Sequence, residues 1–256
     1  MNEKLILITN DDGVHAKGLS ELIAVARQFA RVVVVAPDGA RSGQSNAITM
    51  TAPLYKRLLV QEQNLIVYEC TGTPTDCVKM ALNQILERKP DVLLSGINHG
   101  SNSSVNVIYS GTMGAVLEGC SQEIPSVGFS LNDHSPEADF SAFRPYVSMF
   151  IERVMCQSLP QGVCLNINAP VGEIKGVRVC SQSKGHWVEE FDARQNPHGQ
   201  PYYWMTGQFR NAEPDNTSTD EWALDNGYVS VVPTTCDLTH YASLAWLKNS
   251  GYEQIK

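Results

Sequence analysis

The first 130 residues alternate short apolar runs with segments of helical periodicity, and this alternation is the strongest constraint on the fold. The apolar runs lie at 5–8, 32–35, 65–68, 92–94 and 124–129, and helical spacing of apolar residues occurs at 19–29, 78–86 and 111–120. Continuous apolar strands separated by amphipathic helices are typical of a parallel sheet covered on both faces. The sequence therefore predicts an α/β fold with a mostly parallel sheet, which binds ligands at the carboxyl ends of its strands.

After about residue 130 the pattern changes. A helix is expected at 139–157, strands near 162–168, 175–181 and 228–232, and a short amphipathic helix at 239–248. Residues 183–227 contain three of the four tryptophans, mixed with Gly, Pro and polar residues, which favours extended hairpins over core. With 256 residues, near the upper limit for one core, we expect a single domain over 1–256. Its core would be formed by about 1–182 and 228–237. The hairpin region would be about 183–227, and the tail about 238–256.

Charge and composition exclude several classes of protein. The chain has 19 basic and 27 acidic residues, a net charge of −8, which argues against a protein that coats nucleic acid. A small phosphorylated ligand remains compatible with this balance. No segment is apolar enough to predict a membrane span or a signal peptide. The seven scattered cysteines contain no C-x-x-C pair, which favours a reduced, cytoplasmic protein.

Two adjacent carboxylates follow the first predicted strand, in Asn10-Asp11-Asp12-Gly13. One interpretation is a simple turn, because Asp-Gly is a common turn pair. The other is a cation site, because two carboxylates at the end of a buried strand repel each other until a divalent ion lies between them. Their oxygen ligands suit Mg²⁺, Mn²⁺ or Ca²⁺.

The loop after the second strand, 38–46, contains Arg41 and Ser42. It is either a solvated Gly/Ser loop or a source of a hydroxyl and a guanidinium beside the acidic pair. Arg41 is alternatively a structural ion-pair partner.

Residues 92–117 contain no Asp, Glu, Lys or Arg at all. Amides, hydroxyls and glycine N–H groups suit an oxyanion that carboxylates would repel. Ser110-Gly111-Thr112 opens a predicted helix, whose free N–H groups can hold a phosphate; alternatively Ser110 is an ordinary N-cap. His99, in the same segment, is either a proton shuttle or a solvated loop histidine.

Taken together, these loops resemble the SurE family of stationary-phase survival proteins and nucleotidases. The matching segments, in order, are Ile8-Thr9-Asn10-Asp11-Asp12-Gly13, Arg41-Ser42-Gly43, Ser95-Gly96-Ile97-Asn98 through Asn102, Tyr109-Ser110-Gly111-Thr112 and Asn166-Ile167-Asn168-Ala169-Pro170. The resemblance extends over the whole chain.

The resemblance implies the roles of individual residues. The metal ligands would be Asp11, Asp12, Ser42 and Asn98, and the phosphate would be held by Asn102 and the Ser110-Gly111-Thr112 turn. The implied fold is a Rossmann-like three-layer α/β/α core with extended β-hairpins and a C-terminal segment exchanged between the subunits of a homodimer or homotetramer. The implied reaction is Mg²⁺- or Mn²⁺-dependent hydrolysis of nucleoside 5′- and 3′-monophosphates, with polyphosphate as a side substrate.

The sequence therefore predicts a metal-dependent phosphomonoesterase in which Asp11, Asp12 and Asn98 are catalytic. Asp11 or Asp12 would serve as nucleophile or general base, with no choice between them. One alternative is a non-catalytic nucleotide-binding regulator that uses the same loops. The other is an interaction protein that acts through 183–227, a region expected to lie outside the phosphatase site.

Overall fold

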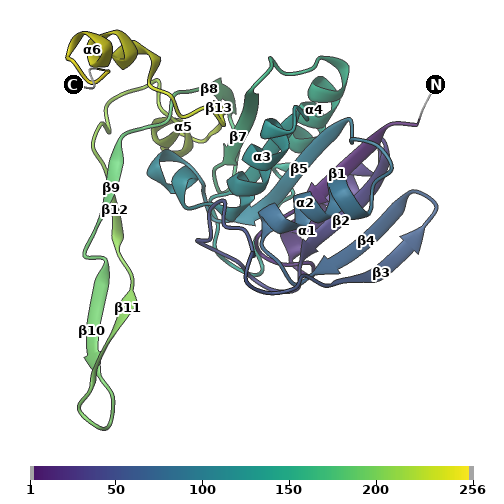
Figure 1. Cartoon of the computed structure of the whole chain (residues 1–256), viewed down its shortest axis with the longest axis horizontal. Helices are drawn as coiled ribbons and strands as arrows, with labels where there is room; N and C mark the ends of the chain where they lie inside the picture. The colour runs from purple at the N-terminus through teal and green to yellow at the C-terminus, as the bar shows by residue number, and fades with distance from the viewer. Residues whose placement is uncertain (1–2, 254–256) are drawn as a thin grey trace.

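The computed structural model describes residues 3–253, and a nine-stranded sheet forms its centre (Figure 1). In spatial order its strands are β3 (Lys56–Glu62), β4 (Leu65–Cys70), β2 (Arg31–Pro37), β1 (Leu5–Thr9), β5 (Val92–His99), β6 (Ser126–Leu131), β7 (Val163–Ala169), β13 (Tyr228–Thr235) and β8 (Gly176–Val179). The strands from β4 to β7 are all parallel, while β3 and β13 pair antiparallel with β4 and β7. The predicted mostly parallel α/β fold is confirmed.

Two helix layers cover the sheet. On one side α1 (Lys17–Ala26) packs with α4 (Arg144–Cys156), and on the other α2 (Pro74–Gln84) packs with α3 (Gly111–Ser121). Strand β1 supplies both layers, because its side chains alternate: Ile6 and Ile8 join the α1/α4 core, and Leu5 and Leu7 join the α2/α3 core. A strand buried on both faces explains the unbroken apolar run in the sequence.

Some boundaries differ from the sequence-based expectation. Strand β5 continues through Ser95 and Asn98 to His99, beyond the apolar run that predicted it. The apolar pattern ends early because the last residues of the strand include polar residues of the site. Helix α4 begins at Arg144 rather than near 139, since Pro145 at the start of a helix needs no hydrogen-bond partner for its nitrogen. Strand β3, exposed along most of its length, was not predicted.

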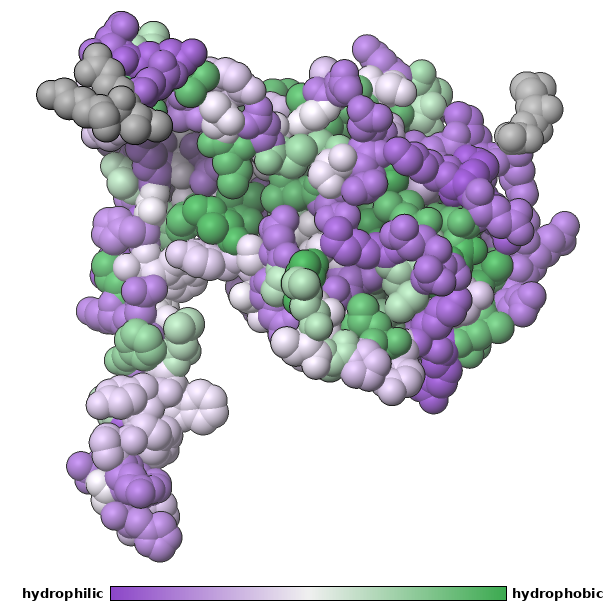
Figure 2. All heavy atoms as spheres, in the orientation of Figure 1, coloured by the Kyte–Doolittle hydropathy of each residue, from purple (hydrophilic) through white to green (hydrophobic). Residues whose placement is uncertain are grey.

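Within 183–227, residues 185–211 form an extended β-hairpin that projects away from the core (Figure 1, Figure 2). Near its base β9 (Gly185–Val188) pairs with β12 (Gln208–Asn211), and further out β10 (Phe191–Gln195) pairs with β11 (Pro201–Met205). The short helix α5 (Asp220–Asp225) then leads back to β13. The outer strands leave Tyr203 and Trp204 about 60% exposed, which agrees with the prediction of hairpins rather than core.

The tail consists of the 3₁₀ helix η2 (Tyr241–Ser243) followed directly by α6 (Leu244–Asn249), where the sequence predicted one helix at 239–248. It lies beyond α5, at the end of the molecule from which the hairpin projects (Figure 1). Leu238 and Trp246 are largely exposed there. No helix within residues 3–253 has the length and apolarity needed to cross a membrane.

Candidate active site

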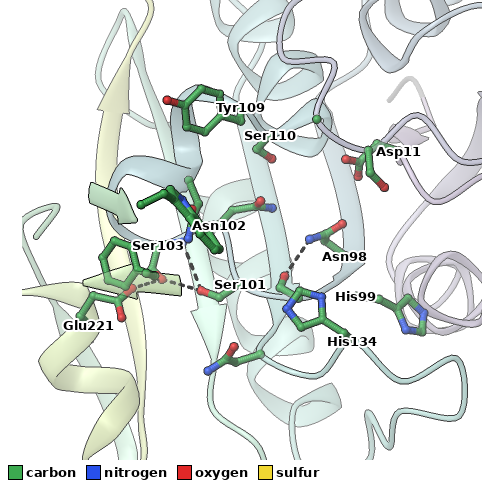
Figure 3. Close-up of a pocket in the computed structure, with 17 residues that line it drawn as sticks. Asp11, Asn98, His99, Ser101, Asn102, Ser103, Tyr109, Ser110, His134 and Glu221 are labelled. Carbon is green, nitrogen blue, oxygen red and sulfur yellow. Dashed lines mark hydrogen bonds between the residues drawn. The ribbon is translucent and has the colours of Figure 1, made fainter. Parts of the chain in front are cut away.

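The loops that follow β1, β2, β5 and β6 meet at one edge of the sheet and enclose a pocket of about 420 Å³ (Figure 3). Five of the predicted metal-binding and phosphate-binding residues line it: Asp11, Ser42, Asn98, Asn102 and Ser110. Gly111 and Thr112 lie directly behind them, in the first turn of α3. This is the position that parallel sheets use for ligands.

Asp11 lies at the floor of the pocket, and only 4% of its surface is exposed. Thr112 donates a hydrogen bond from its hydroxyl to Asp11 Oδ1. Burial raises the pKa of the Asp11 carboxyl to about 6, with a smaller increase from the charge of Asp12, while the hydrogen bond from Thr112 lowers it. A cation that binds beside a buried carboxylate stabilises its charged form.

Asp12 is half-buried and faces a second, adjoining cavity that His99 and His134 also line. Its Oδ2 accepts a hydrogen bond from the backbone N–H of His99, at 3.1 Å. Burial raises the pKa of the Asp12 carboxyl, against the opposing effects of that hydrogen bond and of the two histidines. The two adjacent carboxylates therefore differ in exposure, and they line adjoining cavities rather than the same one.

Asn98 presents its amide oxygen to Asp11 (Figure 3). Its Nδ2 donates to the carbonyl oxygen of Gly100 at 2.7 Å, which fixes the orientation of the amide. The amide oxygen consequently points toward Asp11 (Figure 3). The pairing of β5 with β6 shifts register between Ser95 and Asn98, and this irregularity accompanies the turn of the strand into the site.

These donors fit a hard divalent cation. The carboxylate of Asp11, the amide oxygen of Asn98 and the exposed hydroxyl of Ser42 line the pocket, and Asp12, which lines the adjoining cavity, follows Asp11 directly in the chain. All four supply oxygen ligands, as Mg²⁺ and Mn²⁺ prefer. Within residues 3–253 no group of three or more His, Cys, Asp or Glu side chains is arranged to hold a metal ion. An ion at this position would therefore depend on the neutral ligands as well as on the acidic pair.

Arg41 is a structural ion-pair partner, the second of the two alternatives that the sequence left open for it. Its guanidinium forms an ion pair with Asp38 at 2.6 Å and donates to the carbonyl oxygen of Thr71 at 3.2 Å. Its backbone N–H donates to the carbonyl oxygen of Asp11 at 2.7 Å, so this residue ties the loop of Ser42 to the acidic pair through the main chain.

The Ser110-Gly111-Thr112 turn begins α3. Ser110 is an N-cap, because its hydroxyl accepts the N–H of Met113 at 3.0 Å. The Thr112 hydroxyl is directed to Asp11, so the backbone N–H groups of the turn are its means of holding an anion. Gly111 allows the close approach of the turn to the acidic pair, since a Cβ there would lie 2.8 Å from the Cβ of Asp11.

Asn102 is fixed in the pocket wall by three hydrogen bonds. Its side chain donates to Ser130 Oγ at 2.8 Å, its backbone N–H donates to Asn168 Oδ1 at 2.7 Å, and its carbonyl oxygen accepts from Asn166 Nδ2 at 2.8 Å. The alternating asparagines of β7 therefore support Asn102 from beneath.

His99 is the last residue of β5, is half-buried and has hydrogen-bond partners at both ring nitrogens. Gly18 donates its backbone N–H to His99 Nε2 at 3.3 Å, and the opposite ring nitrogen, Nδ1, lies 2.8 Å from the carbonyl oxygen of Ser135. A carbonyl can only accept and an N–H can only donate, so in this arrangement Nδ1 is the donor and Nε2 is the acceptor. We read His99 as a positioning residue for Asp12 and for the start of α1.

The expectation that 183–227 lies outside the site is wrong. Trp187 of β9, Phe209 of β12 and Glu221 of α5 line the same pocket as Asp11. Asp220 explains this arrangement: its fully buried carboxylate accepts the N–H groups of Ser104 and Ser183, which fastens the base of the hairpin to the polar loop.

Sequence reasoning also missed His134, which lines both cavities and lies against Gly100. A Cβ on Gly100 would come within 2.2 Å of the His134 ring. No motif marks this histidine, and its one signal is its place three residues after the end of β6, at the ligand-binding edge of the sheet.

Comparison with known proteins gives one consistent result. Residues 6–189 match the family model "Survival protein SurE". The chain is 52% identical to the 5′-nucleotidase SurE of Bacteroides fragilis over 246 residues, which are 96% of each chain. It is 51% identical to the 5′-nucleotidase SurE of Phocaeicola vulgatus over 250 residues, 97% of each chain.

The fold agrees with these sequence relationships. The crystal structure of the SurE protein from Aquifex aeolicus superposes with a TM-score of 0.82 and 35% sequence identity, covering 96% of this chain and 99% of that one. On the evidence of sequence, fold and the arrangement of its loops, the chain belongs to the SurE family.

Proposed function

We propose that this protein is a divalent-metal-dependent phosphomonoesterase that hydrolyses nucleoside 5′- and 3′-monophosphates to nucleoside and phosphate. The observation that carries the proposal is the buried Asp11 carboxylate, which shares one pocket with the amide oxygen of Asn98 and with an uncharged loop. The relatives named 5′-nucleotidase SurE, at about half identity over nearly the whole chain, support the same reaction.

Asp11, Asp12, Ser42 and Asn98 would hold one Mg²⁺ or Mn²⁺ per subunit, and Ca²⁺ suits the same oxygen donors. The bound ion would polarise the phosphoryl group and lower the pKa of a water molecule. The ion also resolves an electrostatic conflict, since a phosphate approaches two carboxylates only when positive charge lies between them.

The phosphate would be held by neutral groups. Asn102 is positioned in the pocket wall, and the backbone N–H groups of Ser110-Gly111-Thr112 open a helix of 11 residues. Such preorganised dipoles stabilise charge on the transferring phosphoryl group without reorganising during the reaction. Residues 92–117 themselves contribute no carboxylate that would repel that group.

The exposure of Asp11 and Asp12 suggests different roles for them in the reaction. Asp11 is buried and accepts the Thr112 hydroxyl, so it serves as a ligand and an electrostatic anchor. Asp12 is half-buried and faces the adjoining cavity, so we assign it the role of general base. His134, at the boundary of both cavities, is placed to return a proton to the leaving group.

We also propose one domain over 1–256, with the hairpin and the tail as contacts between subunits of a homodimer or homotetramer. The exposed Trp204 on the hairpin and Trp246 on the tail support this role, because isolated apolar surface of this kind favours burial against a partner. Within residues 3–253 all seven cysteines are free thiols, which supports a cytoplasmic location.

The experiment is a phosphate-release screen over 5′- and 3′-nucleotides and polyphosphate, each with EDTA, Mg²⁺ and Mn²⁺. Release from nucleoside monophosphates in the metal arms alone is the expected result. Nucleotide binding without release in any arm would instead establish the regulator. Loss of partner binding on removal of 183–227, with no role for Asp11, would establish the interaction protein.

A further inference from the structure

The pocket has a second carboxylate, that of Glu221. Asp11 and Glu221 are the two carboxylates among the residues that line it, and they come from opposite sides, β1 and α5 (Figure 3). No lysine or arginine is present among those lining residues to neutralise Glu221. A carboxylate in a pocket for a phosphate ester needs a reason, because it repels the phosphate dianion.

Glu221 is held in place rather than left free in solvent. Ser103 donates its hydroxyl to Glu221 Oε1, and no described residue donates a hydrogen bond to Oε2. The side chain is half-buried, so desolvation raises its pKa while the hydrogen bond from Ser103 lowers it. One oxygen is thus anchored and the other is available to a ligand.

The backbone around Glu221 is equally well fixed. Asp220, fully buried, accepts the N–H of Glu221 at 2.8 Å, the N–H of Ser183 at 2.9 Å and the N–H of Ser104 at 2.8 Å. These bonds join α5, the base of the hairpin and the polar loop into one wall. The position of Glu221 relative to the phosphate site is therefore built into the fold.

Two aromatic residues extend that wall. Trp187 donates its indole N–H to Asn106 Oδ1 at 2.9 Å, which fixes the ring against the polar loop. The Phe209 ring packs edge-on to Trp187, with 6.1 Å between centroids. Both rings line the pocket, and aromatic faces of this kind are platforms on which nucleobases stack.

We infer that Trp187, Phe209 and Glu221 form the nucleoside subsite, in which Glu221 accepts a hydrogen bond from an O–H or N–H donor of the nucleoside. This inference rests on the proposed nucleotidase function, and it names the residues that would recognise the nucleoside part of the substrate. Charge sets the polarity of binding: the phosphate goes to the Asp11 end, where a cation is expected, and the neutral, donor-rich nucleoside goes to the Glu221 end. A pocket of about 420 Å³ falls in the range of about 300–1,000 Å³ typical of small-ligand sites.

The test compares Glu221→Gln with the wild type on three esters at pH 8 with Mn²⁺: 5′-AMP, ribose 5-phosphate and p-nitrophenyl phosphate. Glutamine keeps the size of the side chain and the acceptor for Ser103, but its amide group replaces the free acceptor oxygen. Adenosine binding, measured by calorimetry, is a second readout that requires no turnover. Glu173→Gln, at an exposed position outside the pocket, is the matched control for loss of one charge.

The expected result is a fall of about tenfold in kcat/KM for 5′-AMP and a matching weakening of adenosine binding. Activity on p-nitrophenyl phosphate, which has no nucleoside, should change less than twofold. A loss that persists on ribose 5-phosphate assigns the donor to the ribose hydroxyls, and a loss that disappears there assigns it to the base.

Equal losses on all three esters, or no loss on 5′-AMP, would overturn the inference. Weaker adenosine binding in a protein that releases no phosphate would uphold the subsite and reject the nucleotidase proposal instead.

Discussion

Thr112, in the first turn of α3, donates a hydrogen bond from its hydroxyl to the carboxylate of Asp11 at the end of β1. Both side chains are buried, and 100 residues of sequence separate them. The bond opposes the effect of burial on the pKa of Asp11, and it attaches the proposed phosphate-binding turn to the proposed metal ligand. The proposed positions of cation and phosphate would thereby be coupled through one hydroxyl.

Replacing Thr112 by Val should raise the pKa of Asp11 above its value of about 6, because the change removes a hydrogen bond to the charged form. Protons compete with the cation below that pKa, so the acid limb of kcat/KM should move to higher pH, by roughly one unit. The pH profile with Mn²⁺ measures this shift. Thr49→Val, which removes a hydroxyl from Asp76 outside the pocket, is the control; coincident acid limbs for both variants would refute the coupling.

The burial of Asp11 should also destabilise the metal-free protein. Its pKa is raised from 3.8 to about 6, so between those pH values the folded state binds more protons than the unfolded state, and the free energy of unfolding falls as the pH rises. The whole contribution is about 3 kcal/mol, constant above pH 6. In EDTA, Asp11→Asn should therefore be more stable than the wild type at pH 7.5, by about 1–3 kcal/mol, and nearly equal at pH 4.

Urea unfolding of both proteins at the two pH values checks this expectation, and their difference cancels the other titrating groups. A variant that is less stable than the wild type at pH 7.5 would show that burial of the Asp11 charge costs no free energy.

Gly111 should be irreplaceable for a steric reason. The Cβ of an alanine there would lie 2.8 Å from Asp11 Cβ and 3.0 Å from its Oδ2, so either the turn or the carboxylate must move. A displacement of about 1 Å in an active site costs on the order of 100-fold in rate, which is the expected fall in kcat/KM for Gly111→Ala. In Gly39→Ala the added Cβ would meet no atom within 4 Å, so near wild-type activity is expected there. Similar activities for the two variants would contradict this account of the turn.

Residue pattern alone predicted the parallel strands at the centre of the sheet and the edge at which ligands bind, but not the outer strand β3. The runs at 5–8 and 32–35 are buried on both faces, and hydrophobicity directly reports such burial. Asp11, Ser42, Asn98, Asn102 and Ser110 were grouped by the resemblance to the SurE family, and they line one pocket because the carboxyl ends of parallel strands meet at one edge.

The far wall of the pocket could not be predicted in this way. Glu221 reaches Ser103 across 118 residues, through a hairpin whose return depends on the hydrogen bonds of Asp220. Neither residue belongs to a periodic pattern, and Trp187 was assigned with the exposed aromatics of the hairpin. The hydrogen-bond partners of His99 could not be predicted for a related reason, since Gly18 and Ser135 are distant from it in sequence.

Removal of residues from Leu238 onward should lower the number of subunits in the proposed homo-oligomer. Leu238 is 91% exposed and Trp246 63% exposed, and an isolated helix as short as α6 is marginal in water. If the tail is exchanged between subunits, the truncated chain should have a lower mass by light scattering than the full chain. An unchanged mass at the same concentration would count against exchange and place the subunit contact elsewhere.

The most direct test of the account is phosphate release from 5′-AMP by the wild type and by Asp11→Asn, each with Mn²⁺ and with EDTA. Asp215→Asn, in an exposed loop outside the pocket, serves as the matched control. The account predicts release by the wild type and the control with Mn²⁺ only, and none by Asp11→Asn, whose circular dichroism spectrum remains that of the folded protein. Release by Asp11→Asn at the wild-type rate, or undiminished release in EDTA, would contradict it.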